Sequence, residues 1–206
     1  MNSLRRRAAI SLLAAVVLLL GGCGAARPSQ YYQLTVPGDA PVAKEVDSTP
    51  VTLLVGTLLA SDLYREDRIV YSTMQEEMGT YEYQRWAEPP TEMIQEVLLR
   101  ALRSSGRYRA VFAHRSDASG DFLLRGRLYD FKEVSGNGMV ARLTVDFEMR
   151  DLKSGTTVWT HYYHHDEPVN GKNVPAVVAA LNRNVQRSVK EVLEGLDQYF
   201  ASHPLK

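Results

Sequence analysis

Alternating apolar and polar residues predict paired β-strands in the second half of the chain. From 141 to 150 every odd-numbered residue is apolar and every even-numbered residue is polar. Segments 122–129 and 156–165 flank this run, and Ser-Gly-Asn-Gly at 135–138 and Lys-Ser-Gly at 153–155 supply the turns. Asn-Gly favours a tight hairpin because both residues accept positive φ. We therefore predict a three-stranded meander with one buried and one solvated face.

Two other segments carry the apolar spacing of amphipathic helices. Residues 90–104 follow Pro89-Pro90, which suits a first helical turn, and precede Gly106, a residue type that ends helices. Residues 173–200 repeat apolar side chains at i, i+3, i+4 and i+7. Apolar or alternating runs predict further strands at 51–55, 68–71, 80–86 and 108–112. The predicted fold class is α/β (α+β), a mixed, largely antiparallel sheet flanked by two amphipathic helices.

The N-terminus has the pattern of a bacterial lipoprotein export signal. Arg5, Arg6 and Arg7 precede an apolar run from Ala8 to Leu20, which is too short to span a bilayer as a helix. Leu20-Gly21-Gly22-Cys23 then matches the lipobox, in which small residues precede a cysteine that becomes acylated. We predict that Cys23, the sole cysteine, is the lipidated first residue of the mature chain. A plain secretory signal with an incidental cysteine remains the alternative.

This interpretation divides the chain into 1–22 as signal peptide, 23–50 as acylated N-terminus and tether, and 51–206 as one domain. Segments 24–30 and 37–50 are rich in Ala, Pro, Gly, Ser, Asp and Thr, with Tyr-Tyr-Gln-Leu at 31–34 as a short extended segment inside the tether. Several acyl chains would hold the protein firmly on a membrane. Gly24, where an aspartate favours inner-membrane retention, makes the outer membrane the expected location.

The charge balance of the mature chain argues against nucleic-acid binding. The whole chain carries 24 basic and 24 acidic residues, and loss of residues 1–22 removes three arginines and leaves 21 basic residues. The resulting net charge of −3 lacks the positive excess that carries affinity for phosphate backbones. A mature length of 184 residues suits one well-buried core.

The densest group of potential metal ligands is His161, His164, His165, Asp166 and Glu167. On a strand, His161 and His165 share a face but lie about 13 Å apart, and His164 points to the other face. The sequence therefore predicts a solvated strand end with no metal site. It also lacks a nucleophile elbow and a phosphate-binding glycine loop. We expect no cofactor and no enzymatic activity.

A candidate partner-binding segment surrounds Trp86. Trp and Arg are the residue types that anchor protein interfaces, which makes Arg85 and Trp86 candidates. Tyr81 and Tyr83 add amphipathic rings that can rest on a partner or on lipid. The alternative is that Trp86 fills the core beside the start of the helix.

Taken in order, these segments resemble the ABC-type transport auxiliary lipoprotein family, to which the paraquat-inducible protein C-like lipoproteins belong. The resemblance covers about residues 20–200. It rests on the lipobox, Tyr31-Tyr32-Gln33-Leu34, Arg68-Ile69-Val70-Tyr71, Tyr83-Gln84-Arg85-Trp86-Ala87-Glu88-Pro89-Pro90, the strand that starts at Asp121, and Ala179-Ala180-Leu181-Asn182.

The resemblance implies a non-enzymatic lipoprotein, similar in fold to the N-terminal domain of TolB. Such proteins accompany MCE-domain (mammalian cell entry) proteins and an ABC permease and ATPase in moving lipids between membranes. On this basis we expect an outer-membrane adaptor that anchors or caps a periplasmic MCE assembly, and a homo-oligomer matching its ring is a further hypothesis. The alternatives are an adaptor for a cell-wall synthase or Tol-type complex, and a direct lipid carrier with an apolar cavity beneath helix 173–200.

Overall fold

Strand β7 (Phe122–Ser135) is the central strand of a curled sheet in the computed structural model, which describes residues 27–36, 49–74, 77–136 and 138–204. One edge of β7 pairs antiparallel with β8 (Met139–Asp151), and β8 pairs antiparallel with β9 (Thr157–Pro168). These long ladders confirm the predicted meander. The other edge of β7 pairs in parallel with three strands in turn, namely β2 (Thr49–Val55), β3 (Leu59–Ala60) and β4 (Arg68–Met74).

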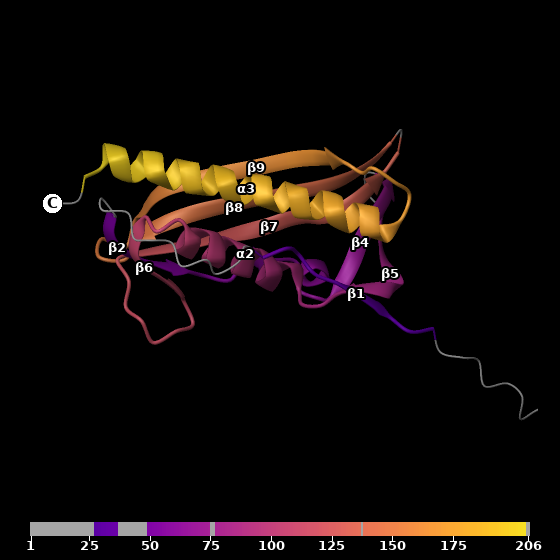
Figure 1. The fold of residues 1–206 in the computed structure, drawn as a ribbon, viewed down its shortest axis with the longest axis horizontal. Helices are drawn as coiled ribbons and strands as arrows, with labels where there is room; N and C mark the ends of the chain where they lie inside the picture. The colour runs from indigo at the N-terminus through magenta and orange to yellow at the C-terminus, as the bar shows by residue number, and fades with distance from the viewer. Residues whose placement is uncertain (1–26, 37–48, 75–76, 137, 205–206) are drawn as a thin grey trace, which may run out of the picture.

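The remaining strands extend the sheet at two ends of the molecule. β6 (Tyr108–Ala113) lies parallel to β2, while β5 (Glu77–Trp86) pairs antiparallel with β4 and carries β1 (Gln30–Tyr32) on its other edge. A 3-10 turn, η1, covers Asp62–Tyr64. Figure 1 shows β1, β4 and β5 at one end and β2 and β6 at the other.

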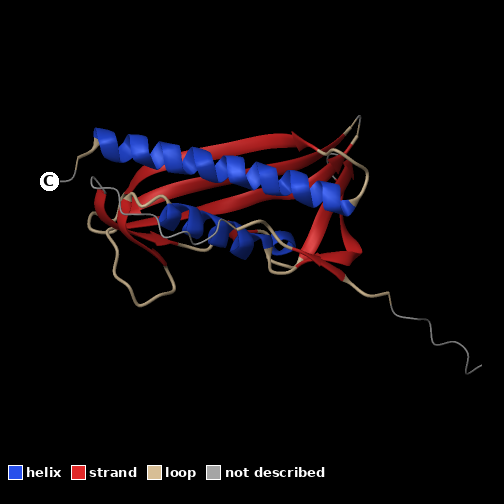
Figure 2. Ribbon diagram, viewed as in Figure 1, coloured by secondary structure: helices blue, strands red, loops and turns tan. Residues whose placement is uncertain are grey.

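Both helices lie on one side of this sheet and contact each other (Figure 2). α2 (Pro90–Ser104) has the predicted bounds, with Pro89 as its N-cap, Pro90 in its first turn and Gly106 at φ 67° just beyond its end. α3 (Val174–Ser202) starts at Asn173, whose side chain accepts a hydrogen bond from the Ala176 amide. The predicted fold class, a mixed sheet with two amphipathic helices and long antiparallel ladders, is confirmed.

A large part of the core lies between α3 and the meander. The helix buries one apolar stripe, and the apolar face of β8 that the alternation predicts is buried opposite it. The buried side chains of the two elements include Val177, Leu181, Val185, Val192, Leu196, Leu143, Val145, Phe147 and Met149. These side chains pack into one cluster in the space where the lipid-carrier hypothesis requires an apolar cavity.

Polar side chains also join α3 to the sheet. Asn184, which is fully buried, accepts a hydrogen bond from the Tyr163 hydroxyl at 2.6 Å and donates to the Ala141 and His165 carbonyls at 2.9 Å. A fully satisfied buried amide fixes the helix in one register on the sheet, because any slide would leave these groups unpaired.

The backbone of β8 lies close to β7 at Gly126. A Cβ at this position would lie 2.1 Å from the backbone oxygen of Asp146, a distance that no side chain tolerates. The ladder shifts register between Leu128 and Asp130, immediately after this contact. Glycine is therefore required here by the approach of the neighbouring backbone, and the bulge bends the long strand.

Candidate binding surfaces

The segment from 30 to 36, which we call the N-terminal strap, is part of the folded domain. β1 pairs with β5 in parallel, with Tyr32 opposite Trp86. The Ala87 amide donates to the Tyr32 carbonyl at 2.7 Å, and the Leu34 side chain is only 2% exposed. Burial of Leu34 and the pairing with β5 attach the strap to the sheet.

Helix α3 holds the next residue of the strap by its backbone. The Thr35 amide donates to Asn182 Oδ1 at 2.8 Å, and Gln186 Nε2 donates to the Thr35 carbonyl at 2.8 Å. Asn182 and Gln186 are four residues apart, so they lie on one face of the helix. The prediction of a tether over 23–50 is thus wrong for residues 30–36, because backbone pairing and a buried leucine place them on the domain.

Trp86 belongs to the core and not to the surface. Its side chain is 0% exposed, and its ring centroid lies 5.3 Å from that of Phe131. The alternative in which Trp86 fills the core is therefore the one that the structure supports. Trp86 is therefore not a partner-binding residue, because a side chain that is already packed on all sides cannot anchor a partner.

The other three candidates on β5 lie in different environments. The Tyr81 hydroxyl donates to Glu133 Oε2 at 2.6 Å, and burial followed by this bond raises the pKa of Tyr81 well above its ordinary value. Arg85 forms an ion pair with Asp67 at 2.8 Å and keeps 26% of its side chain exposed. Tyr83 carries the Arg27 guanidinium over its ring, at 5.9 Å from the centroid. Tyr83 and Arg85 are thus the accessible part of this segment.

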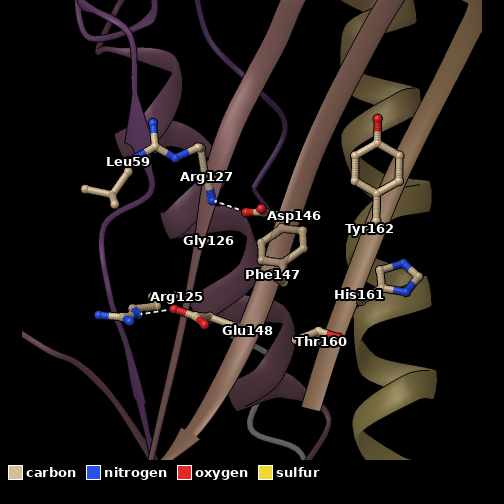
Figure 3. Close-up of a pocket in the computed structure, with 10 residues that line it drawn as sticks. All are labelled: Leu59, Arg125, Gly126, Arg127, Asp146, Phe147, Glu148, Thr160, His161 and Tyr162. Carbon is tan, nitrogen blue, oxygen red and sulfur yellow. Dashed lines mark hydrogen bonds and ion pairs between the residues drawn. The ribbon is translucent and has the colours of Figure 1, made fainter. Parts of the chain in front are cut away.

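A groove of about 420 Å³ lies on the face of the meander that the helices leave uncovered. Figure 3 shows that Arg125 on β7 reaches Glu148 on β8, and that Leu59 and Tyr162 stand at opposite sides of the groove. Leu59 is 58% exposed and Tyr162 is 65% exposed. Opposite charges on neighbouring strands offset each other, so this face carries both positive and negative side chains and no large excess of either charge.

The histidines of β9 divide between the two faces, as the period-2 argument predicts. His161 Nε2 lies 3.3 Å from Glu191 of α3, and His165 Nε2 lies 3.4 Å from Glu167. His164 Nδ1 is instead 2.8 Å from the Thr144 hydroxyl on the opposite face. In the described part of the chain, no three His, Cys, Asp or Glu side chains come together as metal ligands.

Glu167 is held by two arginines of α3. Arg183 donates to one carboxylate oxygen at 2.9 Å, and Arg187 donates to the other at 3.1 Å. The bond from Arg183 is the main reason that the pKa of Glu167 lies below its ordinary value. This carboxylate therefore stays ionised and joins the end of β9 to the helix.

Sequence reasoning missed Asn182, Gln186 and Asn184. Their signal was present only weakly: Asn184 is a polar residue on the apolar stripe of the helix, at a position where an apolar residue is expected. Asn182 and Gln186 look like ordinary surface residues in the sequence, because their partner is the backbone of a segment about 150 residues away.

Solved structures show that this fold recurs in other bacterial proteins. The crystal structure of a DUF330 protein from Xanthomonas campestris is 22% identical to the chain, with a TM-score of 0.67, and the match covers 80% of this chain and 92% of that one. A hypothetical protein from Chlamydia trachomatis is 10% identical, with a TM-score of 0.54 and coverage of 75% and 100%. No curated protein sequence matches the chain.

The class that this fold defines is a single mixed-sheet domain with two helices on one side. The chain matches the family described as the ABC-type transport auxiliary lipoprotein component over residues 32–192, and it belongs to that family. The predicted family is thus confirmed. Family membership makes the chain a lipoprotein of the cell envelope that acts as an auxiliary component of transport. None of the helices formed by the described residues is long and apolar enough to cross a bilayer.

Proposed function

We propose that this protein is the non-enzymatic auxiliary lipoprotein of an MCE/ABC-type intermembrane lipid transport system. Its partners are an MCE-domain protein and the ABC permease and ATPase of the same system. The observation that carries the proposal is the family match across residues 32–192, which covers strands β2 to β9, α2 and most of α3. A lipobox directly before this domain supports the same assignment.

In this proposal Cys23 is acylated and holds the domain on the periplasmic face of the outer membrane. Mass spectrometry of the N-terminal peptide tests the modification, and density-gradient fractionation of cell envelopes tests the membrane. The Cys23→Ala variant should leave the membrane fraction. An unmodified Cys23 in the mature chain, or sedimentation with the inner membrane, would contradict this part of the proposal.

The domain then anchors or caps the periplasmic MCE assembly. The face that the helices leave uncovered supports this role, because Leu59 and Tyr162 are exposed there among paired charges. Interfaces combine such aromatic and aliphatic contacts with a polar rim. A homo-oligomer that matches the ring of the MCE protein is part of the hypothesis, and light scattering in the presence of that protein tests it.

Site-specific photo-crosslinking in intact cells tests the choice of partner. A photoreactive residue at Tyr162 should capture an MCE-domain protein. The same probe at Glu194, on the exposed face of α3, serves as the matched control. Crosslinks from Tyr162 to a cell-wall synthase or a Tol component would instead favour the adaptor for those complexes.

A further inference from the structure

The strap fixes the place where the chain leaves the domain toward its anchor. Only three residues separate Cys23 from Arg27, and four extended residues span at most about 14 Å. Arg27 is itself beside the domain, with its guanidinium over the Tyr83 ring. A membrane anchor on Cys23 therefore holds the bilayer surface close to Tyr83, whatever path the intervening residues take.

The side chains at this exit point suit a lipid headgroup layer. Tyr31 is 63% exposed and lies opposite Arg85 in the β1–β5 pair, two residues along β5 from Tyr83. Tyrosine is enriched at membrane–water interfaces, and a guanidinium can bind lipid phosphate groups. Glu82 is exposed next to Tyr83, so this exit point carries an acidic side chain as well as the Arg27 cation.

We propose that the rim formed by Arg27, Tyr31 and Tyr83 lies against the headgroups of the bilayer that holds the acyl anchor. This inference rests on the proposed acylation of Cys23. β7 is about 45 Å long. The strap pairs with β5, β5 pairs with β4, and β4 pairs with β7 near Ser135, so the strap lies at that end of β7. The β2–β6 end then points away from the membrane and stays accessible to periplasmic partners (Figure 1).

Fluorescence quenching on the full acylated chain tests this orientation. The protein is reconstituted in vesicles of phosphatidylethanolamine and phosphatidylglycerol that contain a lipid with a nitroxide on its headgroup. One variant carries a fluorophore at Glu82→Cys, beside the rim, and the matched control carries it at Lys153→Cys, an exposed turn at the far end of β7. Quenching at position 82 should be at least about twice that at position 153.

A second pair of variants separates the strap from the anchor. A flexible Gly/Ser segment of about 20 residues inserted between Ala26 and Arg27 should lower the quenching at position 82 to that at position 153 while the protein stays in the vesicle fraction. Equal quenching at positions 82 and 153 in the chain without the insertion, with the protein still bound to the vesicles, would overturn the proposed orientation but not the anchor. Loss of the protein from the vesicles would overturn the anchor, and the orientation with it.

Discussion

The Tyr163 hydroxyl of β9 donates to Asn184 Oδ1 at the centre of α3, at 2.6 Å and inside the core. The same asparagine donates to the carbonyls of Ala141 and His165, so one side chain joins the helix to two neighbouring strands. The long helix is thus fixed on the meander by polar contacts of definite geometry, in addition to an apolar stripe that by itself tolerates small slides.

Replacing Asn184 by Ala should destabilise the protein by about 2–4 kcal/mol, because the Tyr163 hydroxyl and two carbonyls lose a buried partner. Tyr163→Phe, which removes only the hydroxyl, should cost about 1 kcal/mol. Urea unfolding monitored by circular dichroism measures both variants. Equal losses in the two variants would show that the contacts to the carbonyls contribute nothing.

Truncating Trp86 should be among the most damaging changes on β5. Trp86→Ala removes a fully buried ring that packs on Phe131, and we expect a loss of about 3–5 kcal/mol in the free energy of unfolding. Tyr83→Ala on the same strand should change this free energy by less than about 0.5 kcal/mol. Thermal unfolding distinguishes the two, and a stable Trp86→Ala variant would contradict the burial of Trp86.

Adding a methyl group at Gly126 should be far more costly than at a glycine in a turn. In Gly126→Ala the new Cβ would meet the Asp146 carbonyl, which forces the two strands apart, and we expect a loss above about 3 kcal/mol. A Cβ at Gly136 has no neighbour within 4 Å, so Gly136→Ala should stay within about 0.5 kcal/mol of the parent. Denaturant midpoints of the two variants make the comparison.

The ion cluster around Glu167 should make stability depend on pH in the acidic range. Arg183 and Arg187 hold the pKa of Glu167 below its ordinary value of 4.5, so the folded state favours the carboxylate. This contribution is fully present above the unfolded pKa and is lost as the pH falls through the folded pKa. The stability difference between the parent and Glu167→Gln should therefore be large at neutral pH and shrink below about pH 4.

Urea titrations at several pH values test this dependence. Glu194→Gln is the matched control, because Glu194 is 57% exposed and its ion pair with Lys190 spans 3.8 Å. The control should lose little stability at any pH, since exposed pairs contribute about 0–1 kcal/mol. A constant difference between the parent and Glu167→Gln across the whole range would contradict the role of the ionised carboxylate.

Releasing the strap should be visible at a single backbone amide. The double variant Asn182→Ala/Gln186→Ala removes both side-chain partners of Thr35, so its amide should exchange with solvent at least about tenfold faster. The Tyr32 region, held by β5, should change less. Hydrogen exchange followed by mass spectrometry or NMR makes the measurement, and unchanged exchange at Thr35 would show that the two side chains do not hold the strap.

Much of the fold could be predicted because its elements are regular over many residues. The alternation of 141–150 predicted β8 and its buried face, and the spacing of 90–104 predicted α2 with the bounds it has in the structure. β1 and β3 were not predicted as sheet strands, since segments of two or three residues have no period to detect. β1 pairs with β5 and β3 pairs with β7, and both partner strands lie far along the chain from them.

The candidate surfaces were predicted less completely than the fold. Trp86 and Tyr83 look equivalent in the sequence, as aromatic residues of one strand, yet one lies inside the core and the other remains accessible. Residues 83 and 86 are three apart on one strand, so alternation alone favours opposite faces for them. Which of the two faces is buried depends on the elements that pack against β5, and the linear pattern does not show these.

The sequence by itself determined the periodic elements, the confirmed family and the prediction of an acylated Cys23, because these depend on local pattern and on residue order. Only the tertiary structure decided that the strap at 30–36 belongs to the domain, that Trp86 is core, and that Asn182, Asn184 and Gln186 join distant segments. The physical reason is that a hydrogen bond to a backbone group imposes no particular side chain on its partner. Contacts of this kind leave no pattern in the sequence and become visible only in the folded structure.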